Sequence, residues 1–442
     1  MTDILDLPDW NVLHKRLADE AYELEVEYAI EPTACIKCGV VGHVYRHGPK
    51  VVGYRDSPIR GHPVLLLVRM QRYRCRSCSG TFLQPLAGIE EGRRMTMRCV
   101  GFIEQQCLRD TFTRVAQHVG CHERTIRRVA EEYILRLESE YEMPRPEWLG
   151  IDEVHVSGKL RCVLTDVGRR IPVDILRDRG QHVVATWLGQ FPGKGDIKGV
   201  TIDMWRPYRD LVRVALPGVP VVVDKYHVLS MVNRCLDRVR KGLREAQSPK
   251  ERRALMRSRH MLMKRPHRLT DKQALDLSGW LKNVPELKAA YECKESFFDI
   301  YDMDWPAAAA AIRAWPASVP TDLRESFREI TTALGNWEPE ILAYFAHPFT
   351  NAYTEALNGV TKVINRQGRG YTFEVLRARV LFRKERIVPP TPAHRCESCG
   401  GVFPPSILST HHIQPIVRGE HPTNALSLCP NCHKRFHTSR ET

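Results

Sequence analysis

Hydrophobic runs separated by polar turns dominate residues 147–224 and predict alternating strands and helices. Runs rich in valine, leucine and isoleucine predict buried strands. Five such segments occur, at Trp148–Val156, Leu160–Thr165, Ile171–Leu176, Gly199–Asp203 and Val219–Asp224. Residues 181–190 and 208–216 read as helices on either side of the fourth strand. The predicted order of elements is therefore β-β-β-α-β-α-β.

This order is that of the RNase H-like fold. In that fold one carboxylate lies on the first strand, a second directly follows the fourth strand, and a third comes from a later helix. Asp152 lies in the first predicted strand and Asp203 ends the fourth, so the topology nominates both. Three converging carboxylates can hold two divalent ions, which suits an in-line phosphoryl displacement. Their hard oxygen ligands favour Mg²⁺ or Mn²⁺.

Glu355 is the predicted third carboxylate, in the segment 351–362. On a helix, Glu355, Asn358 and Lys362 fall on one face. That face would present a metal ligand beside two contacts to DNA phosphates or bases. The same spacing is also typical of a surface helix with a solvated glutamate.

Eight of the 14 cysteines form four C-x-x-C pairs. Two thiolates on one tight turn reach one tetrahedral metal ion, and a second such turn completes the site. A redox motif would need only one pair beside a βαβ unit. The pairs therefore predict one structural Zn²⁺ site near each end of the chain. The ligands are Cys35, Cys38, Cys75 and Cys78 in the first site, and Cys396, Cys399, Cys429 and Cys432 in the second.

A zinc ribbon and a helix-turn-helix are predicted to follow each other before residue 142. The first cysteine site would staple the ribbon over residues 35–85, in which Pro63–Arg69 reads as a strand. Residues 111–133 have the small, apolar and turn positions of a helix-turn-helix. Its second helix would start near His122 and present Arg124, Thr125, Arg127 and Arg128 to a major groove. Any short helical hairpin could share this pattern.

The charge of the chain indicates a polyanionic partner. The formal net charge is +14. Residues 1–34 hold nine acidic and two basic side chains, so the remainder of the chain carries a net +21. Such a balance favours nucleic acid as the partner. The chain has no apolar run near 18 residues and no signal-like N-terminus, which predicts a cytoplasmic protein.

Together these motifs resemble the bacterial insertion-sequence transposases of the ISL-three type. The matching stretches are YRCRSCSGTF in the ribbon, the helix-turn-helix, GIDEVHV, VVVDKYHV and TEALNGVTKVINRQGRG. The resemblance spans roughly residues 35–386. It implies a DDE transposase acting on the terminal inverted repeats of its element, with a helical insertion over residues 228–345. It also implies catalytic roles for Asp152 and Glu355.

The second carboxylate stays open between two residues. Topology favours Asp203. Asp224 belongs to a D-x-x-H element similar to one that supports the active site in related transposases, so it competes with Asp203 for the role of metal ligand.

The C-terminal tail resembles the HNH (ββα-metal) nuclease family over residues 396–437. By that family's pattern, His412 would be the general base that activates water and Asn424 would orient it. The candidate ligands of one catalytic Mg²⁺ or Mn²⁺ are His411, His433 and His437.

The sequence thus predicts an α/β chain with an RNase H-like catalytic core and a helical insertion. The predicted boundaries are an acidic helical N-terminus at 1–34, the ribbon at 35–85, the helix-turn-helix domain at 86–142, the catalytic domain at 147–386 and an HNH-like domain at 393–442. The expected function is metal-dependent cleavage and strand transfer of double-stranded DNA, by at least a homodimer associated with the bacterial nucleoid. Two other hypotheses fit the same motifs: a DNA-binding regulator with an inactive triad, and a nuclease that acts only through its C-terminal domain.

Overall fold

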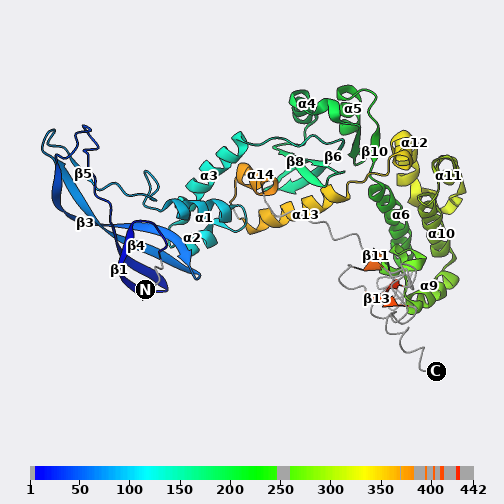
Figure 1. Cartoon of the computed structure of the whole chain (residues 1–442). Helices are drawn as coiled ribbons and strands as arrows, with labels where there is room; N and C mark the ends of the chain where they lie inside the picture. Colours follow the sequence, from blue (N-terminus) through cyan, green and yellow to red (C-terminus); the bar gives the residue numbers. More distant parts are fainter. Residues whose placement is uncertain are drawn as a thin grey trace. The chain divides into compact units, whose positions relative to one another are not determined.

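The computed structural model describes residues 5–245, 259–368 and 370–382, together with four short strands near the C-terminus (Figure 1). The chain divides into two compact units. Unit 1 comprises Met1–Glu142 and Thr361–Lys384, and unit 2 comprises Met143–Val360 and Glu385–Thr442. None of the described helices is long and apolar enough to cross a membrane.

Unit 1 begins with a five-stranded sheet of order β1-β2-β4-β3, with β5 paired to β4. The strands are β1 Trp10–Ala18, β2 Ala21–Tyr28, β3 Val44–Ile59, β4 His62–Cys75 and β5 Thr81–Leu83. The predicted helical N-terminus is therefore wrong, because the segment forms β1 and β2. The residues of β2 alternate: Tyr22, Leu24 and Val26 are buried, and the glutamates between them are more exposed. That two-residue period places all apolar side chains on one face of a strand.

Four helices complete unit 1: α1 Met97–Cys107, α2 Phe112–Val119, α3 Glu123–Ser139 and α14 Phe373–Leu381. The Thr111 side chain caps α2 and the His122 side chain caps α3, so α3 begins where the sequence predicts. Between them Gly120 has a φ of 72°, the left-handed conformation that ends a helix without steric cost.

Two connections join the elements of unit 1. Asp56 of β3 is fully buried and accepts hydrogen bonds from the Thr96 hydroxyl at 2.6 Å and from Arg98 Nε at 2.8 Å, which ties the sheet to the start of α1. Helix α14 buries Val375 and Ala378 against the helices of the helix-turn-helix. Residues 361–384, predicted as the end of the catalytic domain, thus belong to the unit that contains the helix-turn-helix.

Unit 2 is built on a second five-stranded sheet of order β10-β9-β6-β7-β8. The strands are β6 Trp148–Val156, β7 Lys159–Asp166, β8 Ile171–Leu176, β9 Gly199–Ile202 and β10 Val221–Val223. The first three are antiparallel neighbours, whereas β9 runs parallel to β6 and β10 runs parallel to β9. Helix α4 Gln181–Gln190 and the 3₁₀ turn η1 Lys194–Asp196 precede β9, and α5 Arg206–Ala215 follows it. The predicted RNase H-like order is confirmed.

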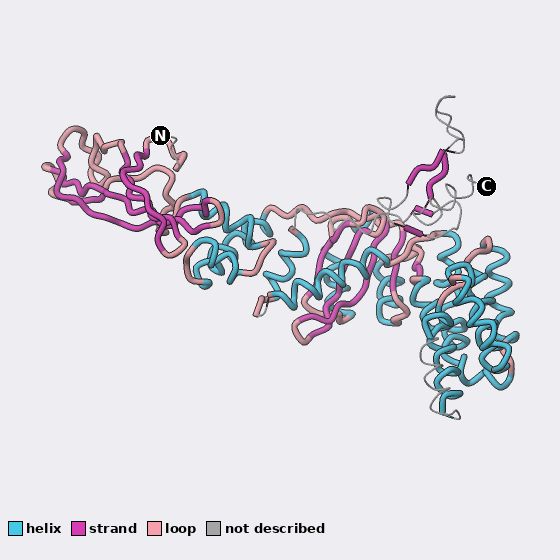
Figure 2. Tube along the Cα trace, turned by 90° about the horizontal axis from the view of Figure 1, so that it is seen from below, coloured by secondary structure: helices cyan, strands magenta, loops and turns pink. Residues whose placement is uncertain are grey.

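A helical insertion follows β10. It contains α6 Lys225–Glu245, α8 Arg259–Met263, η2 Pro266–Arg268, α9 Asp271–Asn283, α10 Pro285–Ile300, α11 Trp305–Ser318, η3 Thr321–Leu323 and α12 Arg324–Ala346. These helices gather into one bundle, visible in Figure 2, and their apolar side chains share one core with the sheet. The chain then forms α13 Ala352–Gln367, the helix of Glu355.

Two short hairpins are described in the tail. Strand β11 His394–Arg395 pairs with β12 Val402–Phe403, and β13 Ser409–His412 pairs with β14 Ala425–Leu428. The rest of the predicted HNH-like domain lies outside the described residues.

Candidate active site and metal centres

Asp152 lies near the middle of β6 and is 8% exposed. Its Oδ1 accepts a hydrogen bond from the Glu153 backbone N–H at 2.7 Å, and its Oδ2 accepts one from Asn358 Nδ2 at 2.8 Å. Burial and repulsion from Asp203 raise the pKa of the Asp152 carboxyl to about 7. Two converging carboxyl groups of this kind favour a cation between them.

Asp203 directly follows β9, which runs beside β6 in the sheet. Its Oδ2 lies 2.9 Å from Nε2 of His227, a residue in the first turn of α6. Its hydrogen bond to Asp203 and the neighbouring Asp224 carboxylate raise the pKa of the imidazole to about 10. The two carboxylates therefore favour the charged form of His227.

Asp224 differs from Asp203 in its surroundings. It is fully buried, and its Oδ1 accepts a hydrogen bond from the Tyr226 backbone N–H at 3.3 Å, which is the geometry of a helix cap for α6. Asp152, Asp203 and His227 line a cleft of about 260 Å³, whereas Asp224 is not among its lining residues. Of the two competing aspartates, Asp203 is the one that faces the space a substrate can enter.

Glu355 approaches the same cluster from α13. Its Oε1 lies 3.9 Å from His227 Nδ1, and burial together with Asp224 raises its pKa. The side chain is 46% exposed and, like Asp224, is not among the residues that line the cleft.

The start of α13 is fixed to the sheet by buried polar contacts. The Thr201 hydroxyl donates to Asn351 Oδ1 at 2.5 Å, and the hydroxyls of Thr165 and Thr354 lie 2.7 Å apart. At Gly150 of β6, a Cβ would lie within 3 Å of the Thr165 and Thr354 hydroxyls, so only glycine permits this approach. The sequence pattern singled out the helix of Glu355 but not these anchors. In the sequence, these contacts are indicated only by the polar residues that make them, which lie beside Glu355 and in the strands: Asn351, Thr354, Thr165 and Thr201.

Several polar atoms of the cluster have no hydrogen-bond partner among the described residues. They are Asp203 Oδ1, Asp224 Oδ2, His227 Nδ1 and Asn358 Oδ1. Buried polar atoms are normally satisfied, so such a group requires an explanation. Ligand atoms of Asp203, Asp224 and His227 also lie within 4.8 Å of one another. The unpaired carboxylate oxygens fit a divalent cation at this cluster, and this grouping keeps Asp224 as a competitor of Asp203 for the role of ligand.

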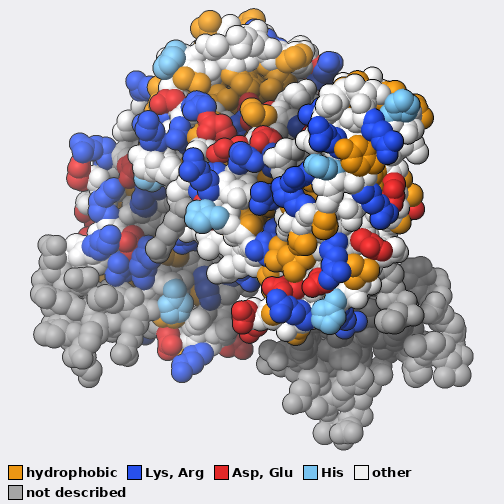
Figure 3. Space-filling view, turned by 90° about the vertical axis from the view of Figure 1, so that its left-hand side faces the viewer, with side chains coloured by type: hydrophobic (Ala, Val, Ile, Leu, Met, Phe, Trp, Pro, Cys, Tyr) orange, Lys and Arg blue, Asp and Glu red, His pale blue; other side chains and the backbone are white. Residues whose placement is uncertain are grey.

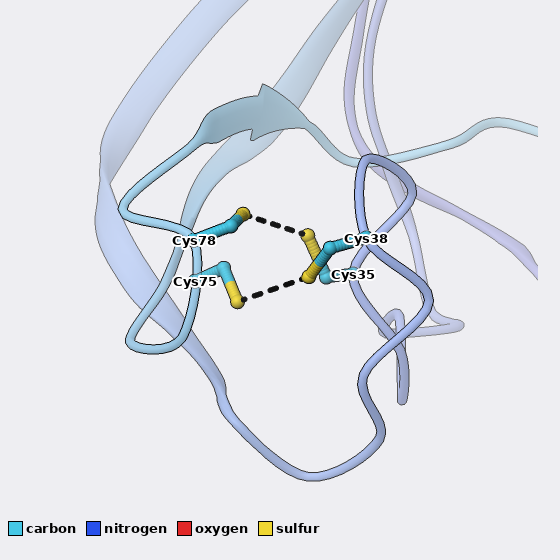
Figure 4. A group of neighbouring side chains, drawn as sticks. All are labelled: Cys35, Cys38, Cys75 and Cys78. Atoms are coloured by element: carbon cyan, nitrogen blue, oxygen red, sulfur yellow. Dashed lines mark hydrogen bonds between the residues drawn. The ribbon is translucent and has the colours of Figure 1, made fainter.

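A second candidate metal centre lies in unit 1 (Figure 4). Cys35 and Cys38 on one turn face Cys75 and Cys78 on another, with Sγ–Sγ distances of 3.8 Å for Cys35–Cys78 and for Cys38–Cys75. A tetrahedron with Zn–S bonds of about 2.3 Å has edges of about 3.8 Å, so the four thiols fit Zn²⁺. The backbone N–H of Cys78 lowers the pKa of Cys75 to about 7, toward the thiolate that a metal binds.

The predicted recognition helix α3 presents arginines to solvent. Arg124 and Arg128 are exposed, and Thr125 and Arg127 are partly buried. Arg127 donates to Glu123 at 2.7 Å, which holds its guanidinium along the helix. In Figure 3 Lys and Arg side chains are spread over much of the visible face. Such a surface suits contacts to DNA phosphates.

Asn358 and Lys362 were predicted to share a DNA-binding face, but their positions differ. Asn358 is 6% exposed and donates to Asp152 Oδ2 and to the Glu153 carbonyl at 3.2 Å. Lys362 is exposed on the following turns of α13. The structure therefore places Asn358 behind a carboxylate, where it cannot readily contact DNA.

Comparison with known protein families gives these sites a context. A family model described as a transposase, of the ISL3 DDE type, matches residues 149–380, more than half of the chain. The chain belongs to the ISL3 family of transposases. Further models match the zinc-finger of transposase IS204/IS1001/IS1096/IS1165 at residues 31–78, the helix-turn-helix domain of transposase family ISL3 at 84–134, and HNH endonuclease at 396–439. No curated protein matches the chain in sequence.

The matches confirm the predicted family, its zinc ribbon and its helix-turn-helix, and the four-cysteine cluster in the ribbon suggests structural zinc. They also confirm an HNH domain in the tail. The side chains predicted for that domain's metal sites and chemistry lie outside the described residues: Cys396, Cys399, Cys429, Cys432, His411, His412, Asn424, His433 and His437.

Proposed function

We propose that this ISL3 transposase cleaves DNA at the terminal inverted repeats of its element and transfers the freed ends to target DNA, with Asp152, Asp203 and Glu355 as the metal-binding carboxylates. The observation that carries the proposal is that Asp203 and Glu355 both approach His227, and that Asp152 lines the same cleft as Asp203 and His227. The three carboxylates come from elements distant in sequence, β6, the end of β9 and α13.

The three carboxylates would hold two Mg²⁺ or Mn²⁺ ions. Such an ion pair lowers the pKa of a water nucleophile and stabilises the charge on the leaving oxygen of a phosphodiester. The residues of the chain supply the geometry. Asp152 is held by Asn358 and by the backbone of Glu153, so its oxygens are oriented before any ligand arrives.

His227 and Asp224 are proposed as positioning residues. Asp224 caps α6 and faces His227 Nδ1 at 3.5 Å, which fixes the ring beside Asp203. From this position the imidazole would hold the Asp203 carboxylate in place for a cation.

The reaction needs no nucleophilic side chain of the protein. Water would attack the phosphodiester at one end of the element, and the released 3′-hydroxyl would attack target DNA, so both steps are in-line phosphoryl transfers. Helix α3 and the basic zinc ribbon would hold the terminal repeats through groove and phosphate contacts. Because two ends must be joined, we propose at least a homodimer on DNA.

The test is Mg²⁺-dependent cleavage of a duplex taken from the DNA that flanks this gene, by full-length protein. Asp152→Asn should reduce the rate by at least about a thousandfold, since it removes a ligand needed in the transition state. Asp174→Asn is the matched control, because Asp174 is buried in β8 of the same sheet and accepts from Trp187 Nε1 at 2.9 Å. It should retain cleavage. A DNA-binding regulator would show no cleavage in any variant.

A second candidate activity belongs to the HNH domain. The tail matches HNH endonucleases, and we propose that it nicks the other DNA strand. His412→Ala should then remove second-strand nicking and leave the Asp152-dependent cut. If His412→Ala abolished all cleavage while Asp152→Asn cleaved normally, the tail would be the nuclease and the triad would be inactive.

A further inference from the structure

The cleft beside the carboxylates is larger than the metal ions require. Its volume is about 260 Å³, whereas a single water molecule needs only about 10–15 Å³ on the same measure. Its lining combines the acidic cluster with a second, apolar and basic group of side chains: Arg179, Met204, Trp205, Tyr208, Met231 and Arg234. This second group has no role in holding metal ions.

Trp205 is the main aromatic surface of the cleft. It follows Asp203 by two residues, and its backbone N–H donates to the Asp203 carbonyl at 2.7 Å. Tyr208 packs edge-on against its ring, with centroids 4.3 Å apart and planes at 83°. The side chain is only partly buried. The indole is thus fixed in orientation close to a proposed metal ligand and still accessible from the cleft.

Arg179 provides positive charge on the same ring. Its guanidinium carbon lies 4.9 Å from the centre of the Trp205 ring, and its Nη1 donates to Glu153 Oε2 at 2.6 Å. Glu153 is the neighbour of Asp152. The Trp205 backbone is therefore hydrogen-bonded to Asp203, and Arg179 is hydrogen-bonded to the residue that follows Asp152.

This combination matches the chemistry of an unpaired nucleotide. Aromatic rings bind the faces of nucleobases without sequence preference, and arginines bind the adjoining phosphates. Thioethers such as those of Met204 and Met231 adapt to a flat apolar ligand. A metal-only site would need none of these side chains.

We propose that this cleft binds one nucleobase next to the scissile phosphate, unpaired from its duplex and stacked on Trp205, with Arg179 at the adjoining phosphate. The inference rests on the proposed function, because it requires DNA at the carboxylates. Extruding a base costs unstacking and unpairing free energy, and stacking on Trp205 offsets part of that cost. The cleft would therefore favour the distorted DNA in which the phosphate reaches the carboxylates.

The test is a double-mutant cycle in which one change is made in the protein and the other in the DNA. Cleavage rates are measured for wild type and Trp205→Ala on paired duplexes from the flanks of this gene, and on duplexes with a single abasic nucleotide placed in turn at each position around the cut. On paired DNA, Trp205→Ala should be slower by about tenfold or more, which is the usual worth of base stacking on an aromatic side chain. On the duplex that lacks the stacked base, the two proteins should cleave at equal rates. Trp205→Phe, which keeps a ring, should recover most of the rate.

The control variant is Trp305→Ala. Trp305 is 49% exposed at the start of α11 and is not among the residues that line the cleft. It should slow no substrate. A Trp205→Ala defect of equal size on every abasic duplex would overturn the inference, and so would no defect on paired DNA. If wild type cleaves no substrate, the proposed function fails instead.

A second readout does not need catalysis. Permanganate attacks unstacked thymines, so Asp152→Asn protein bound to paired DNA with thymine at the identified position should show a changed reactivity there. Adding Trp205→Ala to that protein should remove the change. An unchanged pattern in both proteins would contradict base extrusion.

Discussion

Asn358 Nδ2 donates to Asp152 Oδ2 at 2.8 Å and thereby connects the helix of Glu355 to the strand of Asp152. The same amide group donates to the Glu153 carbonyl at 3.2 Å. Two of the three proposed metal ligands are thus held in relation to each other by one buried side chain. The contact joins residues 206 positions apart, so it forms only when the fold is complete.

Replacing Asn358 should affect chemistry more than folding or DNA binding. We expect Asn358→Ala to lower kcat for cleavage by about 10- to 100-fold, which is typical of losing a residue that orients a metal ligand. Mn²⁺ titration should show a matching loss of affinity. Lys362→Ala, on the exposed side of the same helix, is the control and should leave Mn²⁺ affinity unchanged. Equal Mn²⁺ affinities in Asn358→Ala and wild type would refute this role.

Metal binding should tighten as the pH rises. The pKa of Asp152 is raised to about 7, so below that pH a proton occupies the carboxyl and competes with the ion. We expect Mn²⁺ affinity to increase from pH 6 to pH 8 and binding at pH 6 to release a proton, measured by calorimetry in two buffers. His227, whose pKa is raised to about 10, contributes to both proteins, so the difference between wild type and Asp152→Asn isolates this carboxyl. A pH slope identical in the two proteins would contradict the assignment.

Removing the ribbon zinc should unfold part of unit 1. Cys38→Ser should lower the zinc content by one ion per chain, measured by mass spectrometry, because three thiolates hold Zn²⁺ less tightly than four. Unit 1 should melt at a lower temperature, and binding to terminal-repeat DNA should weaken. Cys121→Ser is the control, since Cys121 lies outside the four-cysteine cluster. Unchanged zinc content in Cys38→Ser would show that the cluster is not a zinc site.

The exposed arginines of α3 should contribute to salt-dependent DNA binding. Arg124→Ala and Arg128→Ala should each weaken binding and reduce the slope of log affinity against log salt by about one, as expected for one lost phosphate contact. If either arginine reads a base, the loss will instead depend on the sequence of the duplex. Arg136→Ala is the control on the same helix, because Arg136 pairs with Glu104 Oε1 at 2.9 Å. A slope that changes as much in Arg136→Ala would argue against a role for the start of α3 in DNA binding.

The catalytic core could be predicted closely because its strands are buried on both faces. Segments rich in apolar residues predicted β6 and β8 with their observed bounds, and the aspartates that follow β9 and β10 were visible directly. The convergence of Glu355 with them was predicted from the expected third carboxylate on a later helix and from the resemblance, since a contact over such a separation leaves no local signal.

Other features depend on packing that the sequence does not display. Strands β1 and β2 were mistaken for a helix because their high charge obscured the two-residue alternation of Tyr22, Leu24 and Val26. Helix α14 packs against the helix-turn-helix through its buried Val375 and Ala378. The sequence did not show this partner, because these side chains could have packed against any other apolar surface. The burial of Asn358 could not be predicted either, because helical spacing shows which residues share a face but not what that face packs against.

The central claim is that Asp203, and not Asp224, is the second metal-binding carboxylate. Single-turnover cleavage in Mg²⁺ by Asp203→Asn and Asp224→Asn tests it most directly. Both proteins should first bind terminal-repeat DNA as wild type does, which shows that they are folded. Because Asp203 faces the cleft and Asp224 caps α6, Asp203→Asn should lose cleavage by at least about a thousandfold, whereas Asp224→Asn should lose about tenfold to a hundredfold. Abolished cleavage in Asp224→Asn together with near-normal cleavage in Asp203→Asn would contradict the account.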